Sequence, residues 1–159
     1  MRPVGPKIDA EESMNTYHIN ELHFSIPSGW KDNSMQALIL PAAEGDKSAS
    51  EAALVITRDG AHPELLLSQY ADQHLVESAR RLPGYKLLER RTIEAGGEPA
   101  IEVRQLWTPP GQVNVLQRQL IMKSLDLFLS LTLSIRETEK HRMEGVWQGI
   151  VRSIQRRKS

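Results

Sequence analysis

The sequence predicts an α+β domain in which two main helices pack against an antiparallel sheet. Two observations carry this prediction: several short segments alternate between apolar and polar residues, and two longer segments have apolar residues at helical spacing. The alternating segments amount to about six to seven strands. A chain of 159 residues is the size of one ordinary domain and can bury a substantial core.

The first strands are expected before residue 60. Ile19–Ile26 alternates approximately as a strand does, and the turn residues Pro27–Gly29 follow it. Trp30 is expected to anchor that turn. Met35–Leu40 and Ala52–Thr57 are short apolar runs with a loop of small and charged residues between them. We expect these two runs to be neighbouring antiparallel strands.

A helix is predicted from residue 63 to about residue 81. Pro63 suits the first turn of a helix because its missing N–H would have no helical partner there. Apolar residues then recur at steps of three and four, at Leu67, Ala71, Leu75, Ala79 and Leu82. Pro83 and Gly84 end the helix, since neither residue continues one cheaply.

From Tyr85 the period changes to two, which predicts strands near 85–94, 99–107, 113–122 and 127–135. The connections have hairpin lengths and contain turn residues, so the four strands are expected to form a meander. A last helix follows, with Thr138 as its expected N-cap. Its apolar stripe consists of Met143, Val146, Trp147, Ile150, Val151 and Ile154.

The alternation also predicts which side chains of the meander share a face. If residues 108–112 form a hairpin loop, the two strands beside it present apolar residues and amides on one side. These residues are Ile101, Val103, Gln105, Trp107, Val115, Gln117, Gln119 and Ile121. The glutamines either satisfy neighbouring groups and water or bind a ligand, because a buried amide needs a partner. The leucines from Leu127 to Leu133 point to the helices or to this face, depending on the register of the last hairpin.

Composition excludes several classes of function. The chain has no cysteine, and its 20 Lys and Arg residues balance 20 Asp and Glu residues, so no overall field attracts nucleic acid or an anionic membrane. Phosphate-binding loops, zinc motifs and nucleophile motifs are absent from the sequence, and the histidines are scattered. We therefore expect a protein of the reducing cytoplasm with no enzymatic activity, cofactor or metal.

The two ends and the longest apolar run are expected to play minor roles. Residues 1–16 have no apolar run of signal-peptide length and are expected to form a flexible arm, and residues 156–159 a solvated basic tail. Leu125–Ile135 contains Asp126 and several hydroxyl residues, so it is too short and polar to span a bilayer.

Four carboxylates of the strands near 85–107 are expected to pair with nearby arginines. They are Glu89, Glu94, Glu98 and Glu102.

Several of these segments together resemble a known family. The segment from His18 to Asp59 has the order strand, Pro-Ser-Gly-Trp turn and two further strands. It is followed by Arg80–Leu87, Gly96–Ala100, a Gln-Arg-Gln strand at 117–119 and a last helix with Trp147. This pattern resembles the effector-associated chaperones of bacterial type VI secretion, which belong to the DcrB-related proteins. The resemblance covers residues 17–155, which we expect to be one domain, and it implies a curved, PsbP-like antiparallel sheet.

The resemblance implies a function as well. Such chaperones are homodimers that shield the N-terminal apolar helices of a secreted toxin on the concave sheet face and help load it onto the secretion spike. The implied positions in this chain are Met35 and Ala37, with Gln119 as the matching glutamine. Together with the shared face, the expected client groove is Met35, Ala37, Ile39, Ile101, Val103, Gln105, Gln117 and Gln119. No nucleic acid and no direct membrane insertion are implied.

Two other classes of function remain open. One is a domain that binds a small ligand or lipid, which would have an enclosed cavity rather than an open groove. The other is a structural accessory protein with the same fold, because a fold alone does not decide function.

Overall fold

A computed structural model describes residues 13–19, 21–30, 33–40, 52–60 and 62–157. The loop at 41–51, most of the expected arm and the last two residues of the basic tail lie outside the described residues. The chain divides into two compact units, Met1–Asp32 and Asn33–Ser159. Each unit is described by itself, and the single domain over 17–155 stays a prediction.

The first unit contains a two-stranded antiparallel hairpin of β1, Met14–His18, and β2, His23–Pro27. Strand β1 was not predicted, and it begins inside the segment expected to be an arm. The strand expected at Ile19–Ile26 is therefore the second half of a hairpin. Gly29 has φ +92° in the turn after β2, a conformation that glycine adopts at low cost. Trp30 is 68% exposed, so the prediction that it anchors this turn is wrong.

The second unit is built on a six-stranded antiparallel sheet with strand order β3-β4-β8-β7-β6-β5. The strands are β3 Met35–Leu40, β4 Ala52–Asp59, β5 Lys86–Ala95, β6 Glu98–Trp107, β7 Val115–Ser124 and β8 Leu127–Arg136. The predicted β3–β4 pair and the four-strand meander are confirmed, and with them the α+β class. The pairing of β4 with β8 was not predicted, and it joins the two sets of strands into one sheet.

The two helices begin later than the sequence predicted. Helix α1 is Leu67–Arg81, and the side chain of Gln69 accepts a hydrogen bond of 2.9 Å from the backbone N–H of Leu66 at its start. Helix α2 is Lys140–Ser153 and follows a 3₁₀ turn at Glu137–Glu139. Thr138 therefore lies within that turn, and the prediction that it caps α2 is wrong.

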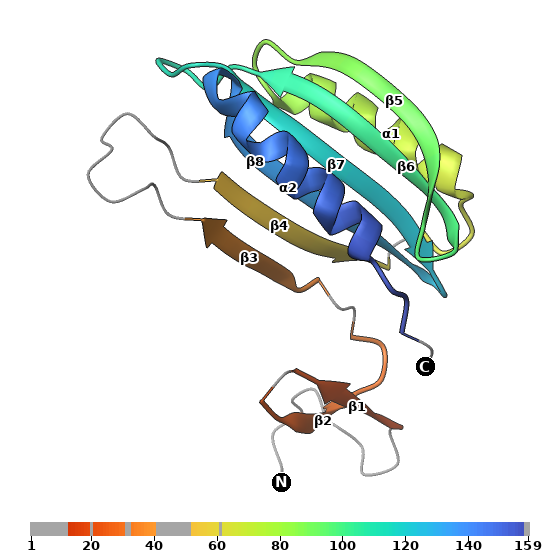
Figure 1. Ribbon diagram of the computed structural model, residues 1–159. Helices are drawn as coiled ribbons and strands as arrows, with labels where there is room; N and C mark the ends of the chain where they lie inside the picture. The colour runs from red at the N-terminus through yellow and green to blue at the C-terminus, as the bar shows by residue number, and fades with distance from the viewer. Residues whose placement is uncertain (1–12, 20, 31–32, 41–51, 61, 158–159) are drawn as a thin grey trace, which may run out of the picture. The chain divides into compact units, whose positions relative to one another are not determined.

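The helices lie on opposite faces of the sheet, with α2 in front of it and α1 behind it in Figure 1. Under α2 the buried cluster includes Leu116, Leu120, Leu133, Met143, Trp147 and Val151. Leu129 and Leu131 pack against this same cluster, which decides the open question of the last hairpin: the β8 leucines point to α2. Under α1 a second cluster contains Tyr70, Ala71, Leu75, Ile101, Val103, Ile121 and Phe128.

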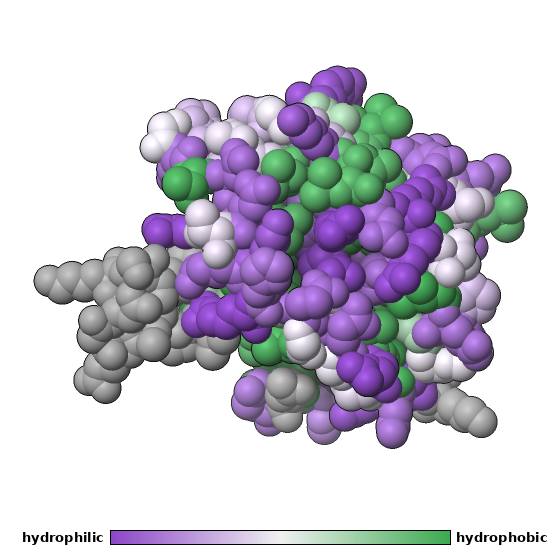
Figure 2. All heavy atoms as spheres, turned by 45° about the horizontal axis from the view of Figure 1, so that its top comes forward, coloured by the Kyte–Doolittle hydropathy of each residue, from purple (hydrophilic) through white to green (hydrophobic). Residues whose placement is uncertain are grey.

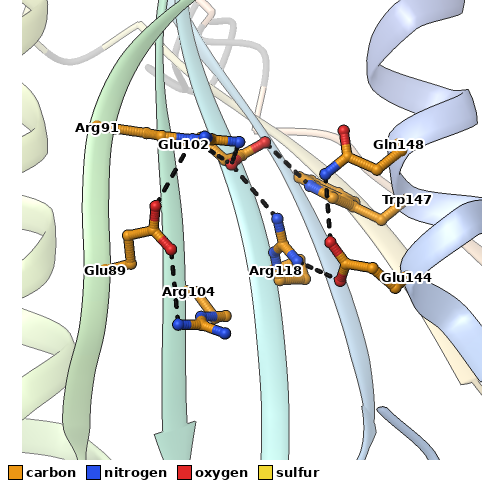
Figure 3. A network of polar contacts seen from close by, with 8 residues as sticks. All are labelled: Glu89, Arg91, Glu102, Arg104, Arg118, Glu144, Trp147 and Gln148. Atoms are coloured by element: carbon orange, nitrogen blue, oxygen red, sulfur yellow. Dashed lines mark hydrogen bonds and ion pairs between the residues drawn. The ribbon is translucent and has the colours of Figure 1, made fainter. Parts of the chain in front are cut away.

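A network of charges holds α2 to the sheet (Figure 3). Glu102 of β6 is 4% exposed and accepts hydrogen bonds from Arg91 at 2.9 Å, Arg118 at 3.3 Å and the Trp147 indole at 3.2 Å. Arg118 also pairs with Glu144 of α2. Although partial burial raises it, hydrogen bonds from Arg118 and Gln148 hold the pKa of Glu144 below its usual value. The predicted pairing of Glu102 with an arginine is thus found, in a buried setting.

The end of the described chain is also anchored. Arg156 donates hydrogen bonds to the backbone oxygens of Ala95 at 3.1 Å and Lys123 at 3.0 Å, and it pairs with Glu98 at 2.9 Å. Gly96 makes room for it, because a Cβ there would lie 2.8 Å from Cγ of Arg156. Arg156 therefore closes two hairpin turns, contrary to the expectation of a solvated tail.

Candidate functional site

All eight residues of the expected groove lie on one face of the sheet, the face that α1 partly covers. Residues directly opposite each other in an antiparallel pair have their side chains on the same side. The strand registers link Val103 to Gln119, Gln119 to Thr132, Thr132 to Val55 and Val55 to Ala37, from one side of the sheet to the other. We call this surface the α1 face. The predicted sharing of a face across the β6–β7 hairpin is confirmed.

Helix α1 covers the half of this face formed by β6 and β7. Ile101 is 3% exposed and Val103 is fully buried in the cluster under α1. The ring of Tyr70 stacks on Phe128 with 3.9 Å between centroids, and its hydroxyl donates to Asp59 at 2.9 Å. Burial, together with this bond to Asp59, raises the pKa of Tyr70. In the structure Ile101 and Val103 are thus core residues rather than exposed ones.

The other half of the α1 face is an apolar surface on β3 and β4. Met35 is 67% exposed and Ile39 is 60% exposed, and Ala37 between them is exposed too. Ala53 and Val55 of β4 lie beside them and are half-buried. We call these five residues the open strip. Three of the eight expected groove residues therefore lie in the open strip.

A row of polar side chains crosses the sheet next to the open strip. The Tyr85 hydroxyl donates to Gln105 at 2.7 Å, the Gln105 amide donates to Gln117 at 2.9 Å, and the Gln117 amide donates to Ser134 at 3.1 Å. Ser134 is paired with Ala53 of the open strip. Burial raises the pKa of Tyr85 above its ordinary value. The glutamines thus satisfy one another and their neighbours, one of the two alternatives left open by the sequence.

Gln119 has a different set of partners. Its amide nitrogen lies 3.2 Å from the Thr132 hydroxyl and 2.9 Å from Nε2 of His74 on α1. Burial lowers the pKa of His74, and the nearby charge of Arg81 lowers it further while Asp59 acts the other way. Among the described residues, the Gln119 carbonyl oxygen has no hydrogen-bond partner, although the residue is only 3% exposed. Gln119 therefore retains an unused acceptor on the α1 face.

Sequence reasoning missed His74, which it treated as one of several scattered histidines. Its position carried a usable signal, because residue 74 follows Ala71 by three and Leu67 by seven, next to the apolar stripe of α1. Tyr70 follows Leu67 by three and was missed for the same reason. Both residues reach the α1 face and contact residues of the sheet.

A second apolar surface lies mainly on the opposite face of the sheet, and Ile39 of the open strip also lines it. A hollow of about 240 Å³ between α2 and the β3–β4 pair is lined by Leu38, Ile39, Ala52, Leu54, Leu133, Met143, Val146 and Ile150. Leu38 is 60% exposed and Val146 is 45% exposed, so the hollow is part of the molecular surface.

In the described part of the chain, no three His, Asp or Glu side chains come together as a metal site would require. None of the described helices is long and apolar enough to cross a membrane.

Comparison with known proteins places the chain in a family. The sequence model of the DcrB family matches residues 21–153. The chain is 27% identical over 141 residues to Effector EagT6 of Pseudomonas aeruginosa, with 89% of this chain and 95% of that protein covered.

Solved structures show a similar fold. A crystal structure of PA94, a Pseudomonas aeruginosa protein of unknown function, has a TM-score of 0.80 at 27% identity and covers 92% of this chain and 99% of its own. LpqN of Mycobacterium tuberculosis, which is involved in cell envelope biogenesis, is similar in fold, with a TM-score of 0.51 at 14% identity and 90% of both chains covered. The match of the family model over most of the sequence shows that the chain belongs to the DcrB family.

Proposed function

We propose that this protein is a non-enzymatic, homodimeric chaperone of the cytoplasm that serves type VI secretion. It holds the N-terminal apolar helices of a secreted effector and helps to load that effector onto the secretion spike. Support comes from the DcrB family match, from the 27% identity to Effector EagT6 and from the sequence motifs that resemble effector-associated chaperones.

The observation that carries the proposal is the open strip beside a row of amides. A transmembrane helix of about 20 apolar residues is insoluble in water unless its surface is covered. Met35 and Ile39 offer exposed apolar contact, and the flexible thioether of Met35 adapts to clients of different shape. The open strip is thus a surface on which one side of such a helix is removed from water.

The amides supply the polar part of the contact. Helices that pack in membranes contact each other through small residues and hydroxyl groups, which need hydrogen-bond partners. Gln117 is half-buried at the border of the open strip and can both donate and accept, while Gln105 holds it in place. The oxygen of Gln119, which has no partner among the described residues, is a further acceptor beside this surface. Ile101 and Val103 support this surface from the core.

A small-ligand or lipid-binding role has one observation in its favour, the apolar hollow of about 240 Å³ between α2 and the β3–β4 pair. A lipid chain would bind in that hollow on the α2 face, whereas a client helix would bind on the α1 face. The two functions therefore use opposite faces of the sheet, and one pair of variants separates them.

The test uses Met35→Glu on the open strip and Val146→Glu in the hollow. Both side chains are exposed, so neither substitution buries a charge in the free protein. The probe is a model helix of about 20 apolar residues with small residues four apart. The parent and Val146→Glu should keep this helix in solution, and Met35→Glu should not, because its carboxylate would be desolvated against the helix.

Circular dichroism checks that both variants are folded. If Met35→Glu retains the helix as well as the parent does, the open strip is not the binding surface. If Val146→Glu alone loses binding, the helix binds in the hollow on the α2 face rather than on the open strip, and a lipid chain would compete with it there.

A further inference from the structure

The two end strands of the six-stranded sheet are built very differently. Strand β5 carries a bulge between Leu87 and Glu89 and five charged residues, Lys86, Glu89, Arg90, Arg91 and Glu94. Figure 2, which turns the top of Figure 1 towards the viewer, shows hydrophilic residues over much of that face, with hydrophobic patches among them. Bulges and charges are the features by which natural sheets keep their edges from pairing with other chains.

Strand β3, at the other end, has none of these features. Its sequence is Met-Gln-Ala-Leu-Ile-Leu, without charge, proline or bulge, and it pairs with β4 through six consecutive residues. Met35, Leu38 and Ile39 are each at least 60% exposed, although they point to both faces of the sheet. Within the described residues β3 has one strand neighbour, β4, and its outer edge pairs with no other described strand.

We infer that β3 pairs in antiparallel fashion with β3 of a second copy of this chain, about a two-fold axis at Ala37. The inference rests on the proposed function for the homodimer and names the surface that forms it. A free strand edge is matched by the backbone of another strand. Two identical uncharged strands have no like charges to repel each other, and a two-fold axis lets the same patch serve both copies.

The sequence of β3 favours Ala37 as the centre of this pairing. In that register Met35 lies opposite Ile39 of the second copy, and the two small Ala37 side chains face each other. A centre at Leu38 would place Met35 opposite Pro41, which has no backbone N–H to donate. Pairing about Ala37 keeps Pro41 outside the paired stretch.

This arrangement extends the candidate binding surface. Antiparallel pairing about a centre on Ala37 keeps the α1 faces of both copies on one side of a continuous sheet. The two open strips then become adjacent, and Met35 and Ile39 of both copies form one apolar surface. A dimer of this kind holds two apolar helices side by side.

The absence of cysteine makes cross-linking a direct test. In the inferred register the two Cβ atoms at position 37 are about 5 Å apart, close to the separation that a disulfide requires. Residue 36 lies opposite residue 38, so the residues at position 36 of two Gln36→Cys chains are diagonal neighbours about 7 Å apart, farther than a disulfide spans. Oxidised Ala37→Cys should therefore be mostly covalent dimer. Gln36→Cys alone should link poorly, but it should link well when mixed with Leu38→Cys.

A charge on the edge provides the second measurement. Leu38→Lys places an ammonium group on the β3 edge and should convert the dimer to monomer in light scattering, because edge lysines oppose strand pairing. Leu88→Lys on β5 is the matched control, since Leu88 is also an exposed leucine on an end strand, at 46%. It should remain dimeric. Circular dichroism should show both variants folded.

The outcomes separate this inference from the proposed function. Monomer mass for the parent overturns the inference. So does a parent dimer in which Ala37→Cys fails to link or Leu38→Lys stays dimeric. Binding of the model helix by the parent is measured independently. If the parent binds the helix but does not pair through β3, the proposed function stands and the β3 dimer is refuted. If the parent pairs through β3 but binds no helix, the β3 dimer stands and the proposed function is refuted.

Discussion

Trp147 should contribute more to stability than any other side chain of α2. It is fully buried, its indole N–H donates to Glu102 at 3.2 Å, and the guanidinium of Arg118 lies 5.7 Å from its ring centre. Trp147 thus combines a large apolar contact with a hydrogen bond to a buried carboxylate, and two substitutions separate these contributions.

The expected magnitudes follow from these contacts. Trp147→Ala removes the ring and leaves a cavity under α2, which should lower the free energy of unfolding by about 3 to 5 kcal/mol. Trp147→Phe retains most of the apolar contact but removes a hydrogen bond to a charged group, which should cost about 1.5 to 3 kcal/mol. The order of stability should be parent, then Trp147→Phe, then Trp147→Ala.

Urea denaturation followed by circular dichroism measures these differences. Val146→Ala is the matched control, because Val146 is the preceding residue of α2 and is 45% exposed. Its effect should stay within about 0.5 kcal/mol. An unchanged midpoint for Trp147→Ala would mean that α2 is not packed on the sheet. Equal losses for Trp147→Phe and Trp147→Ala would mean that the bond to Glu102, rather than burial of the ring, dominates.

Two further predictions concern pH and the anchored end of the chain. Burial and Arg81 lower the pKa of His74 below 6.5, so the folded protein favours the neutral ring. The stability that the neutral ring contributes is complete above pH 6.5, and it is lost as the pH falls towards the pKa of His74 in the folded protein. The denaturation midpoint of His74→Asn should therefore fall less steeply than that of the parent as the pH drops through this interval. If the two midpoints fall in parallel, His74 is not the source of the pH dependence. Arg156→Met keeps the apolar stem but loses the guanidinium, so it should lower the free energy of unfolding by about 1.5 to 3 kcal/mol, whereas Arg157→Met, at an exposed neighbour, should change little. Equal midpoints for the two arginine variants in urea would show that the contacts of Arg156 add no stability.

Local patterns in the sequence determined most of the elements and one part of the site. The apolar stripe from Met143 to Ile154 predicted α2, and the change to period two after Tyr85 predicted four strands that the structure contains. The same alternation predicted that Gln105 and Gln117 share a face, because neighbouring side chains of a strand alternate between faces whatever the rest of the fold does. Helix starts were less well predicted, since a cap depends on one or two side chains, as Gln69 shows.

Only the tertiary structure decided what lies against each face. Alternation places Ile101 and Val103 on the same side as Met35, but whether a helix covers them depends on where α1 docks, and docking energy comes from residues far apart in the sequence. The pairing of β4 with β8 is equally non-local, and it is what joins Met35 and Gln119 into one surface. His74 illustrates the same limit, because its contact with Gln119 crosses 45 positions of sequence. A local pattern assigns each side chain to a side of its own element, whereas packing between distant elements determines which of those sides is buried and which remains open to a partner.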